Sequence, residues 1–405
     1  MLKLFNTLGK KCETFKPVNR KVVTLFNCGP SVYQRSHIGN FRTFLFEDIL
    51  VGYLEYSGYR VKRGMNVTDV EDKAIKEAEI KKTTITALTE ANIRRFVQEM
   101  KLLRMKIPDY LLKASEAVDE AVKIIEHLLR LKIAYWHRGN VYFDPLKVPR
   151  FGELFGLDMT RWPSKKKRFH KDTYPGIQWN LGDFVLWHGC TGKETTCWDT
   201  RIGRGRPSWN IQDPSMMSKH FHETLSIYCG GHDNLFRHHD YSKAILESIR
   251  PYPMARFWLH CYHLHVNGKK MSKSKGNIYY TEDILRKGYT VSELRFFLIY
   301  GHYRKKLNYS NDTMRSAAEK LRNYKKMVMD IERVAKRAAT TDTKTARNLK
   351  TIFSVRMDDD LDIKSAFDQL YDAFAKVDVK SLKPAEASGL IKGLKGIDEV
   401  LQVIF

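Results

Sequence analysis

Two segments far apart in the chain carry residue types that can bind and activate a nucleotide. The first is His37-Ile38-Gly39-Asn40, which follows the apolar run 22–26. The second is the lysine loop, residues 269–277, which is rich in amines and hydroxyls and contains a glycine near its end. An imidazole can donate a hydrogen bond to charge developing on the α-phosphate of ATP, and lysine amines can hold the leaving pyrophosphate. Together the two segments predict an ATP site that works by positioning and electrostatics.

The elements expected around the first segment supply a cradle for phosphate. The run 22–26 predicts a strand, Cys28-Gly29-Pro30 predicts a turn, and the apolar residues after Gly39 recur at largely helical spacing. A helix that opens after such a turn offers free backbone N–H groups and the positive end of its dipole. We expect catalysis by His37, Asn40, Lys270 and Lys273. We expect ATP, with Mg²⁺, to bind at Gly29, His37, Gly39, Asn40, Lys270, Met271, Ser272, Lys273 and Ser274.

Beyond these two segments, the chain resembles class I aminoacyl-tRNA synthetases, and among them the cysteinyl-tRNA synthetases, to about residue 375. The runs that share the resemblance are residues 58–61, 66–73, 183–187, 205–211, 230–239 and 357–362. The resemblance implies ATP-dependent activation of an amino acid to an aminoacyl-adenylate and its transfer to the terminal ribose of a tRNA. A formal net charge of +24 agrees with a tRNA partner, because excess cationic side chains attract a polyphosphate.

The resemblance and the order of expected elements imply an α/β fold, a Rossmann-like catalytic domain with a connective insertion, followed by an α-helical bundle. We expect a helix over 118–131 and a strand pair around 134–143 within the insertion. In the family a small domain for anticodon contact often follows the bundle, and we expect it to be short or absent here. The expected units are 1–115 and 206–262 for the two catalytic halves, 116–205 for the insertion, 263–308 for the connecting segment with the lysine loop, and 309–405 for the bundle.

The resemblance also implies which residues contact the amino acid. Asp233 would take the substrate ammonium, and Trp209 would form a wall of the side-chain pocket beside Ser31. Tyr228 stands where the family has a histidine, so the part of the site that recognises the side chain differs from the family. The full set of expected amino-acid contacts is Cys28, Gly29, Ser31, Trp209, Asp213, Tyr228 and Asp233.

The zinc ion of the family marks the largest departure. In the family two cysteines, a histidine and a glutamate hold the ion, which binds the substrate thiolate. Cys28 and His238 match two of these positions, but Asp213 stands at the second cysteine and Ser242 at the glutamate. A neutral serine hydroxyl is a poor zinc ligand. At most three plausible ligands therefore remain, namely Cys28, Asp213 and His238.

Two alternatives follow for the metal. In the first, Cys229 supplies a substitute thiolate and a rewired zinc site survives. In the second, which we expect, zinc is lost, Cys28 is a small buried residue and Asp213 lines the pocket as an unpaired carboxylate. Such a carboxylate favours a cationic or hydrogen-bonding substrate side chain over a thiol, so the amino acid need not be cysteine. We expect Cys190 and Cys197 to be ordinary loop thiols.

Composition narrows the setting of the protein. Six cysteines in 405 residues are too sparse for a disulfide scaffold and favour a reducing compartment. The chain has no apolar run long enough to span a bilayer, and its N-terminus lacks the features of a secretory signal. We therefore expect a cytoplasmic protein with no membrane partner. We also expect a monomer.

Three functions are compatible with these residues. The first is a cysteine–tRNA ligase or close paralogue. The second is an adenylate-forming ligase that joins the activated amino acid to a small amine, which a short C-terminal region would favour. The third is a non-catalytic RNA-binding relative. Intact His37, Gly39, Lys270 and Lys273 argue against the third.

Overall fold

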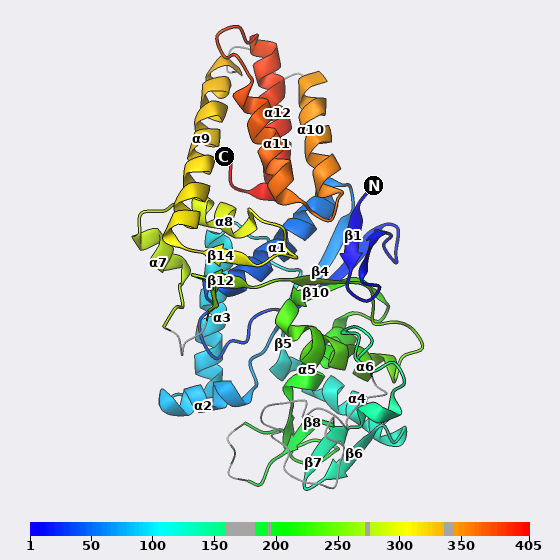
Figure 1. The fold of residues 1–405 in the computed structure, drawn as a ribbon. Helices are drawn as coiled ribbons and strands as arrows, with labels where there is room; N and C mark the ends of the chain where they lie inside the picture. Colours follow the sequence, from blue (N-terminus) through cyan, green and yellow to red (C-terminus); the bar gives the residue numbers. More distant parts are fainter. Residues whose placement is uncertain (159–182, 193, 195, 272–275, 336–343) are drawn as a thin grey trace.

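A parallel sheet of five strands forms the centre of the molecule, in the order β11-β10-β3-β4-β5 (Figure 1). The computed structural model describes residues 1–158, 183–192, 194, 196–271, 276–335 and 344–405. The strands are β3 (Val22–Asn27), β4 (Arg60–Val67), β5 (Tyr110–Lys113), β10 (Leu225–Gly231) and β11 (Ala255–Cys261). Strand β3 is apolar and almost wholly buried, as a strand covered on both faces should be. This sheet confirms the predicted α/β, Rossmann-like fold.

Two hydrophobic cores cover the two faces of this sheet. Neighbouring strand residues point to opposite faces, so that Cys229 joins the first core and Tyr228 the second. Helices of the first core are α1 (Ile38–Tyr56), α3 (Ile85–Leu102) and α8 (Val291–Ile299). Helices of the second are α4 (Val118–Arg130), α5 (Trp209–His220) and α6 (Tyr241–Glu247). Helix α2 (Asp72–Ile80) follows β4 and contacts α3.

The inserted region forms a second, antiparallel sheet in the order β6-β7-β8-β9. Its strands are β6 (Ala134–His137), β7 (Asn140–Phe143), β8 (Phe184–Gly189) and β9 (Gly205–Pro207). The predicted helix over 118–131 and the predicted strand pair around 134–143 are confirmed, as α4 and the β6–β7 hairpin. In Figure 1 this sheet and the C-terminal bundle lie at opposite ends of the molecule.

The connection between β8 and β9 contains a disulfide between Cys190 and Cys197. The expectation of two ordinary loop thiols is therefore wrong. Pairing of β8 with β9, continued by a bridge between Trp198 and Gly205, draws the two ends of the loop together. The two Cα atoms lie 6.5 Å apart, within the range that a disulfide spans. One argument for a reducing compartment is thereby removed.

The described part of the C-terminal region 309–405 is mainly helical, as predicted. A short sheet of β12 (Leu264–Val266), β13 (Lys269–Lys270) and β14 (Leu307–Tyr309) leads into it, with α7 (Thr281–Arg286) between β13 and α8. The bundle consists of α9 (Asn311–Ala335), α10 (Lys344–Met357), α11 (Ile363–Ala375) and α12 (Pro384–Leu401). Helix α12 packs on α1 and so anchors the bundle to the catalytic sheet.

At the other end of the chain, a hairpin of β1 (Lys3–Asn6) and β2 (Lys11–Thr14) lies against the edge strand β11. No helix in the described ranges is long and apolar enough to cross a membrane. The proposed unit boundaries near 115, 205, 262 and 308 stay predictions.

Candidate active site

A cavity of about 990 Å³ opens at the carboxyl ends of β3, β4 and β10. In open α/β sheets this edge is where ligands bind. The predicted site residues that line the cavity are Cys28, Gly29, Ser31, His37, Gly39, Asn40, Trp209, Asp233, Lys270 and Met271. The cavity lining does not include Asp213, Tyr228, His238, Ser242 or Cys229. Ser272, Lys273 and Ser274 lie outside the described residues. The structure thus brings the two ends of the ATP signature to one cavity.

Two glycines keep the predicted ATP end of this cavity open. A Cβ on Gly29 would lie 2.1 Å from the backbone oxygen of Asn66 on the neighbouring strand, so only glycine fits there. A Cβ on Gly39 would lie 3.0 Å from the His37 ring and 3.6 Å from the sulfur of Met271. A side chain at either position would therefore displace residues that border the cavity.

His37 caps the N-terminus of α1, and the cap fixes which imidazole nitrogen carries the proton. Its Nδ1 accepts a hydrogen bond from the backbone N–H of Asn40 at 3.2 Å, while Asn40 Oδ1 accepts from the backbone N–H of His37 at 3.0 Å. Because Nδ1 is an acceptor, the proton of the neutral ring lies on Nε2. Burial lowers the pKa of His37 to about 4, which keeps the ring neutral near pH 7.

Asp233 and Lys270 meet in the cavity from two different parts of the chain. Asp233 lies on the single helical turn that follows β10, and Lys270 lies at the end of β13. The Lys270 Nζ atom is 3.5 Å from Asp233 Oδ2, and His263 Nε2 is 3.7 Å from the same oxygen. Both side chains of the Lys270 pair are about half exposed, so this contact is weak and can be exchanged for contacts to a ligand.

Asp213 is not the unpaired pocket carboxylate that we expected. It is fully buried on α5 and accepts three hydrogen bonds, from Asn66 Nδ2 at 2.6 Å, Tyr228 Oη at 2.5 Å and His238 Nε2 at 2.9 Å. A buried carboxylate has to be satisfied by donors, and three different elements supply them here. Tyr228 is also fully buried, where burial and the neighbouring Asp213 raise its pKa well above the usual value. Asp213 and Tyr228 therefore lie behind the cavity wall.

Cys229 does not point toward Cys28. It is a buried member of the core on the α1 face of the sheet, and its Sγ lies 4.0 Å from the backbone oxygen of Phe26. Tyr228 takes the opposite face, because side chains alternate along β10. The alternative in which Cys229 replaces a zinc ligand is therefore wrong.

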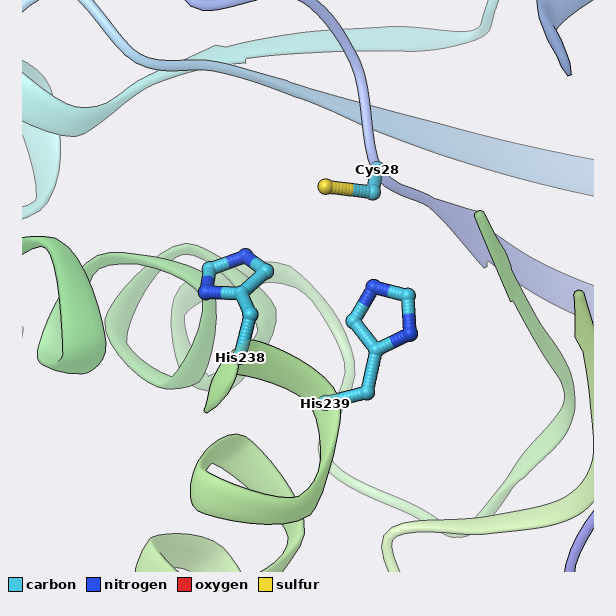
Figure 2. Close-up of side chains that lie close together, drawn as sticks. All are labelled: Cys28, His238 and His239. Carbon is cyan, nitrogen blue, oxygen red and sulfur yellow. The ribbon is translucent and has the colours of Figure 1, made fainter. Parts of the chain in front are cut away.

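A different residue lies beside Cys28 and His238. Among the described residues, Cys28, His238 and His239 form a buried group whose ligand atoms lie within 4.8 Å of one another (Figure 2). The two histidines belong to the short π-helical segment Leu235–Asp240. Sequence reasoning missed His239 because it weighed only the positions of the family's four ligands. The adjacent His-His pair was the signal that could have found it.

The far end of the cavity is polar and borders the insertion. Glu71 accepts a hydrogen bond from the Ser31 hydroxyl, and burial raises the pKa of Glu71 to about 7. Arg206 pairs with Asp72, and burial together with Arg206 lowers the pKa of His188 to about 4. These residues line the cavity but were not predicted as site residues. Common charged residues of this kind do not indicate a site in the sequence, and only the folded chain brings Arg206 of β9 to Asp72 of α2.

The chain is similar to known proteins over most or all of its length. The family model "tRNA synthetases class I (C) catalytic domain" matches residues 14–319. The cysteine–tRNA ligase of Koribacter versatilis is 36% identical over all of this chain and 82% of its own length. That of Chlamydia pneumoniae is 33% identical over all of this chain and 86% of its own. A methionyl-tRNA synthetase of Mycobacterium tuberculosis, solved with methionyl-adenylate, superposes with a TM-score of 0.66 at 14% identity, over 95% of this chain and 90% of that one. This last likeness supports the fold alone.

Proposed function

The chain belongs to the cysteine–tRNA ligase family of class I aminoacyl-tRNA synthetases, and from that premise we propose how its residues activate and transfer an amino acid. As a member of this family it is an aminoacyl-tRNA ligase. In the proposed reaction a carboxylate oxygen of the amino acid attacks the α-phosphorus of ATP, the bond to the bridging oxygen breaks, and pyrophosphate leaves. The aminoacyl group then passes to a tRNA hydroxyl and AMP is released.

The observation that carries this proposal is the meeting of His37, Gly39 and Lys270 in one cavity at the carboxyl end of β3. The Nε2–H of His37, oriented by the cap, donates to an α-phosphate oxygen as charge develops there. Lys270, released from Asp233, holds the β- and γ-phosphates together with Lys273. Mg²⁺ bound to ATP would neutralise the pyrophosphate as it leaves.

The amino acid binds beside the nucleotide. Asp233 takes its ammonium group, because this carboxylate is accessible and its partners are weakly held. Trp209 forms one wall of the side-chain pocket, and Cys28 and Ser31 border it. We assign Asp213 and Tyr228 a positioning role, since both lie behind the residues that a substrate would touch.

The acceptor is tRNA, whose phosphates suit the chain's positive charge. A cytoplasmic location and a monomeric state remain predictions. We propose that the four-ligand zinc site of the family does not form here. Both oxygens of Asp213 are engaged by hydrogen-bond donors, and the Ser242 hydroxyl is neutral and buried with no partner among the described residues.

The test is amino-acid-dependent exchange of ATP with labelled pyrophosphate, run with each of the twenty amino acids and followed by charging of total tRNA. We expect exchange with one amino acid and stable aminoacylation of tRNA by it. Exchange without any charging of tRNA would contradict the acceptor. Failure of every amino acid to support exchange would contradict the proposed activity itself.

A further inference from the structure

We propose that Arg35 is a positioning residue for the activation step. It ties the segment that follows the lysine loop to the segment that carries His37, and so holds the two halves of the ATP signature in place relative to each other. Arg35 lies two residues before His37, and its side chain lines the cavity. The contacts of Arg35 follow from the geometry alone, and only their effect on catalysis rests on the proposed function.

The Arg35 guanidinium bridges two carboxylates that belong to different helices. Its Nε and Nη2 donate to Glu99 Oε1 at 2.9 and 2.6 Å, and its Nη1 donates to Glu282 Oε1 at 2.5 Å. Glu99 is buried on α3, whereas Glu282 lies on α7, shortly after the lysine loop, and is about half exposed. Because the donors of arginine lie in a fixed planar fork, one side chain can hold two elements in a defined arrangement.

Tyr280 adds an aromatic contact to this pair of carboxylates. The Arg35 Cζ atom lies 4.7 Å from the ring centroid of Tyr280, the residue that precedes α7. A guanidinium over an aromatic face is attracted by the electrons of the ring. The hydrogen bond from Arg35 lowers the pKa of Glu282, so this ion pair stays charged near neutral pH. We call Arg35, Glu99, Tyr280 and Glu282 the Arg35 clamp.

Two further hydrogen bonds connect the clamp to both halves of the ATP signature. The backbone oxygen of Tyr279 accepts from the backbone N–H of Ile38, the first residue of α1, at 3.0 Å. Asn277 Nδ2 donates to the backbone oxygen of Lys270 at 3.3 Å. The segment 277–282 is therefore fixed to Lys270 at one end, to the start of α1 in its middle and to the Arg35 clamp at its other end.

This arrangement bears on catalysis because His37 and Lys270 are proposed to act on the same triphosphate. A displacement of about 1 Å in a reacting or binding group can cost about 10²-fold in rate. Without Arg35, the segment 277–282 would keep its hydrogen bond to α1 but lose its tie to α3. Lys270 would then be held less firmly relative to His37. The amino-acid contacts proposed above involve no residue of the clamp, so the loss should fall on ATP.

The first test compares ATP and amino-acid kinetics in pyrophosphate exchange by the full-length protein. Arg35→Leu should lower kcat/KM for ATP about 10–30-fold and change the KM for the amino acid by less than about twofold. Arg35→Lys keeps the charge but not the planar fork, and should recover part of the loss. Arg95→Ala is the matched control, because Arg95 pairs with Glu282 at 3.2 Å from an exposed position outside the cavity. It should keep wild-type kinetics.

Glu282 tests the same tie from its exposed end. This keeps the test valid if Arg35→Leu leaves the buried Glu99 without its partner and fails to fold. Glu282→Ala should lower kcat/KM for ATP about 3–10-fold without a change in the urea denaturation midpoint. In the double variant, the kinetic loss should equal that of Arg35→Leu alone, because either substitution breaks the same contact. Losses that simply add would overturn the proposed coupling.

Hydrogen exchange measures the tie without any enzymatic turnover. In Arg35→Leu, the backbone amides of segment 277–280 and of α7 should exchange about fivefold faster than in wild type, while those of β4 should be unchanged. Unchanged exchange in α7, or equal losses for ATP and for the amino acid, would overturn the role of Arg35. Faster exchange in α7, combined with a wild type that shows no pyrophosphate exchange, would support the tie and count against the proposed function alone.

Discussion

The end of the cavity proposed for ATP and the end proposed for the amino-acid side chain, beside Trp209 and Cys28, are built in different ways. At the ATP end, backbone features do the positioning, through Gly29, Gly39 and the cap made by His37. At the side-chain end, a buried network centred on Asp213 holds side chains against one another. The first end must place donors around a phosphate, which any class I enzyme must do. At the second end Asp213 lies outside the cavity, but it orients His238, whose ring stacks on the cavity residue Trp209.

The largest effect is expected from a substitution at the proposed ATP end. His37→Ala removes the donor to the α-phosphate and should lower the rate of pyrophosphate exchange by about 10²–10³-fold with little change in amino-acid KM. His222→Ala is the control, because His222 is an exposed histidine outside the cavity. A His37→Ala enzyme within about threefold of wild type would remove His37 from the transition state.

At the side-chain end, loss of Asp213 should affect the free energy of unfolding more than it affects amino-acid selectivity. Asp213→Ala leaves three buried donors without their acceptor and should lower the free energy of unfolding by about 2–4 kcal/mol, measured by urea denaturation with EDTA present. The exposed Asp199, which pairs with Arg204 at the surface, provides the control, and Asp199→Ala should change stability by less than about 0.5 kcal/mol. Unchanged stability of Asp213→Ala, with altered amino-acid selectivity, would mean that Asp213 faces the pocket after all.

The residues at the two ends also differ in how far the sequence alone could predict their positions. Strand β3, helix α1, helix α4 and the β6–β7 hairpin could be predicted from local sequence patterns, because residues close in sequence determine them. The partners of Asp213 come from β4, β10 and the π-helical segment, and only the assembled sheet brings them together. The Cys190–Cys197 disulfide likewise depends on the pairing of β8 with β9. The position of His239 beside Cys28 depends on the orientation of the segment Leu235–Asp240.

The pH dependence sharpens the picture of the ATP end. Burial lowers the pKa of His37 in the folded chain to about 4, below the usual value near 6.5. The unfolded chain therefore binds more protons between pH 6.5 and 4, and the contribution of His37 to stability, complete above pH 6.5, is lost as the pH falls through this window. NMR titration of labelled histidines should place the His37 midpoint near pH 4. A midpoint near 6.5 would show that the cap does not hold the neutral ring.

Tyr228→Phe tests the smallest effect and bears most directly on the difference between the two ends. The variant removes one hydroxyl that donates to Asp213, whose carboxylate keeps Asn66 and His238 as donors, so the loss of stability should be about 1 kcal/mol. Because the hydroxyl points into the buried network, the KM for the amino acid should change by less than about threefold, as measured by pyrophosphate exchange. A tenfold rise in KM with unchanged stability would place the hydroxyl in contact with substrate. Tyr228 would then contact the substrate side chain directly, and the Asp213 network would no longer be a purely supporting structure behind the cavity wall.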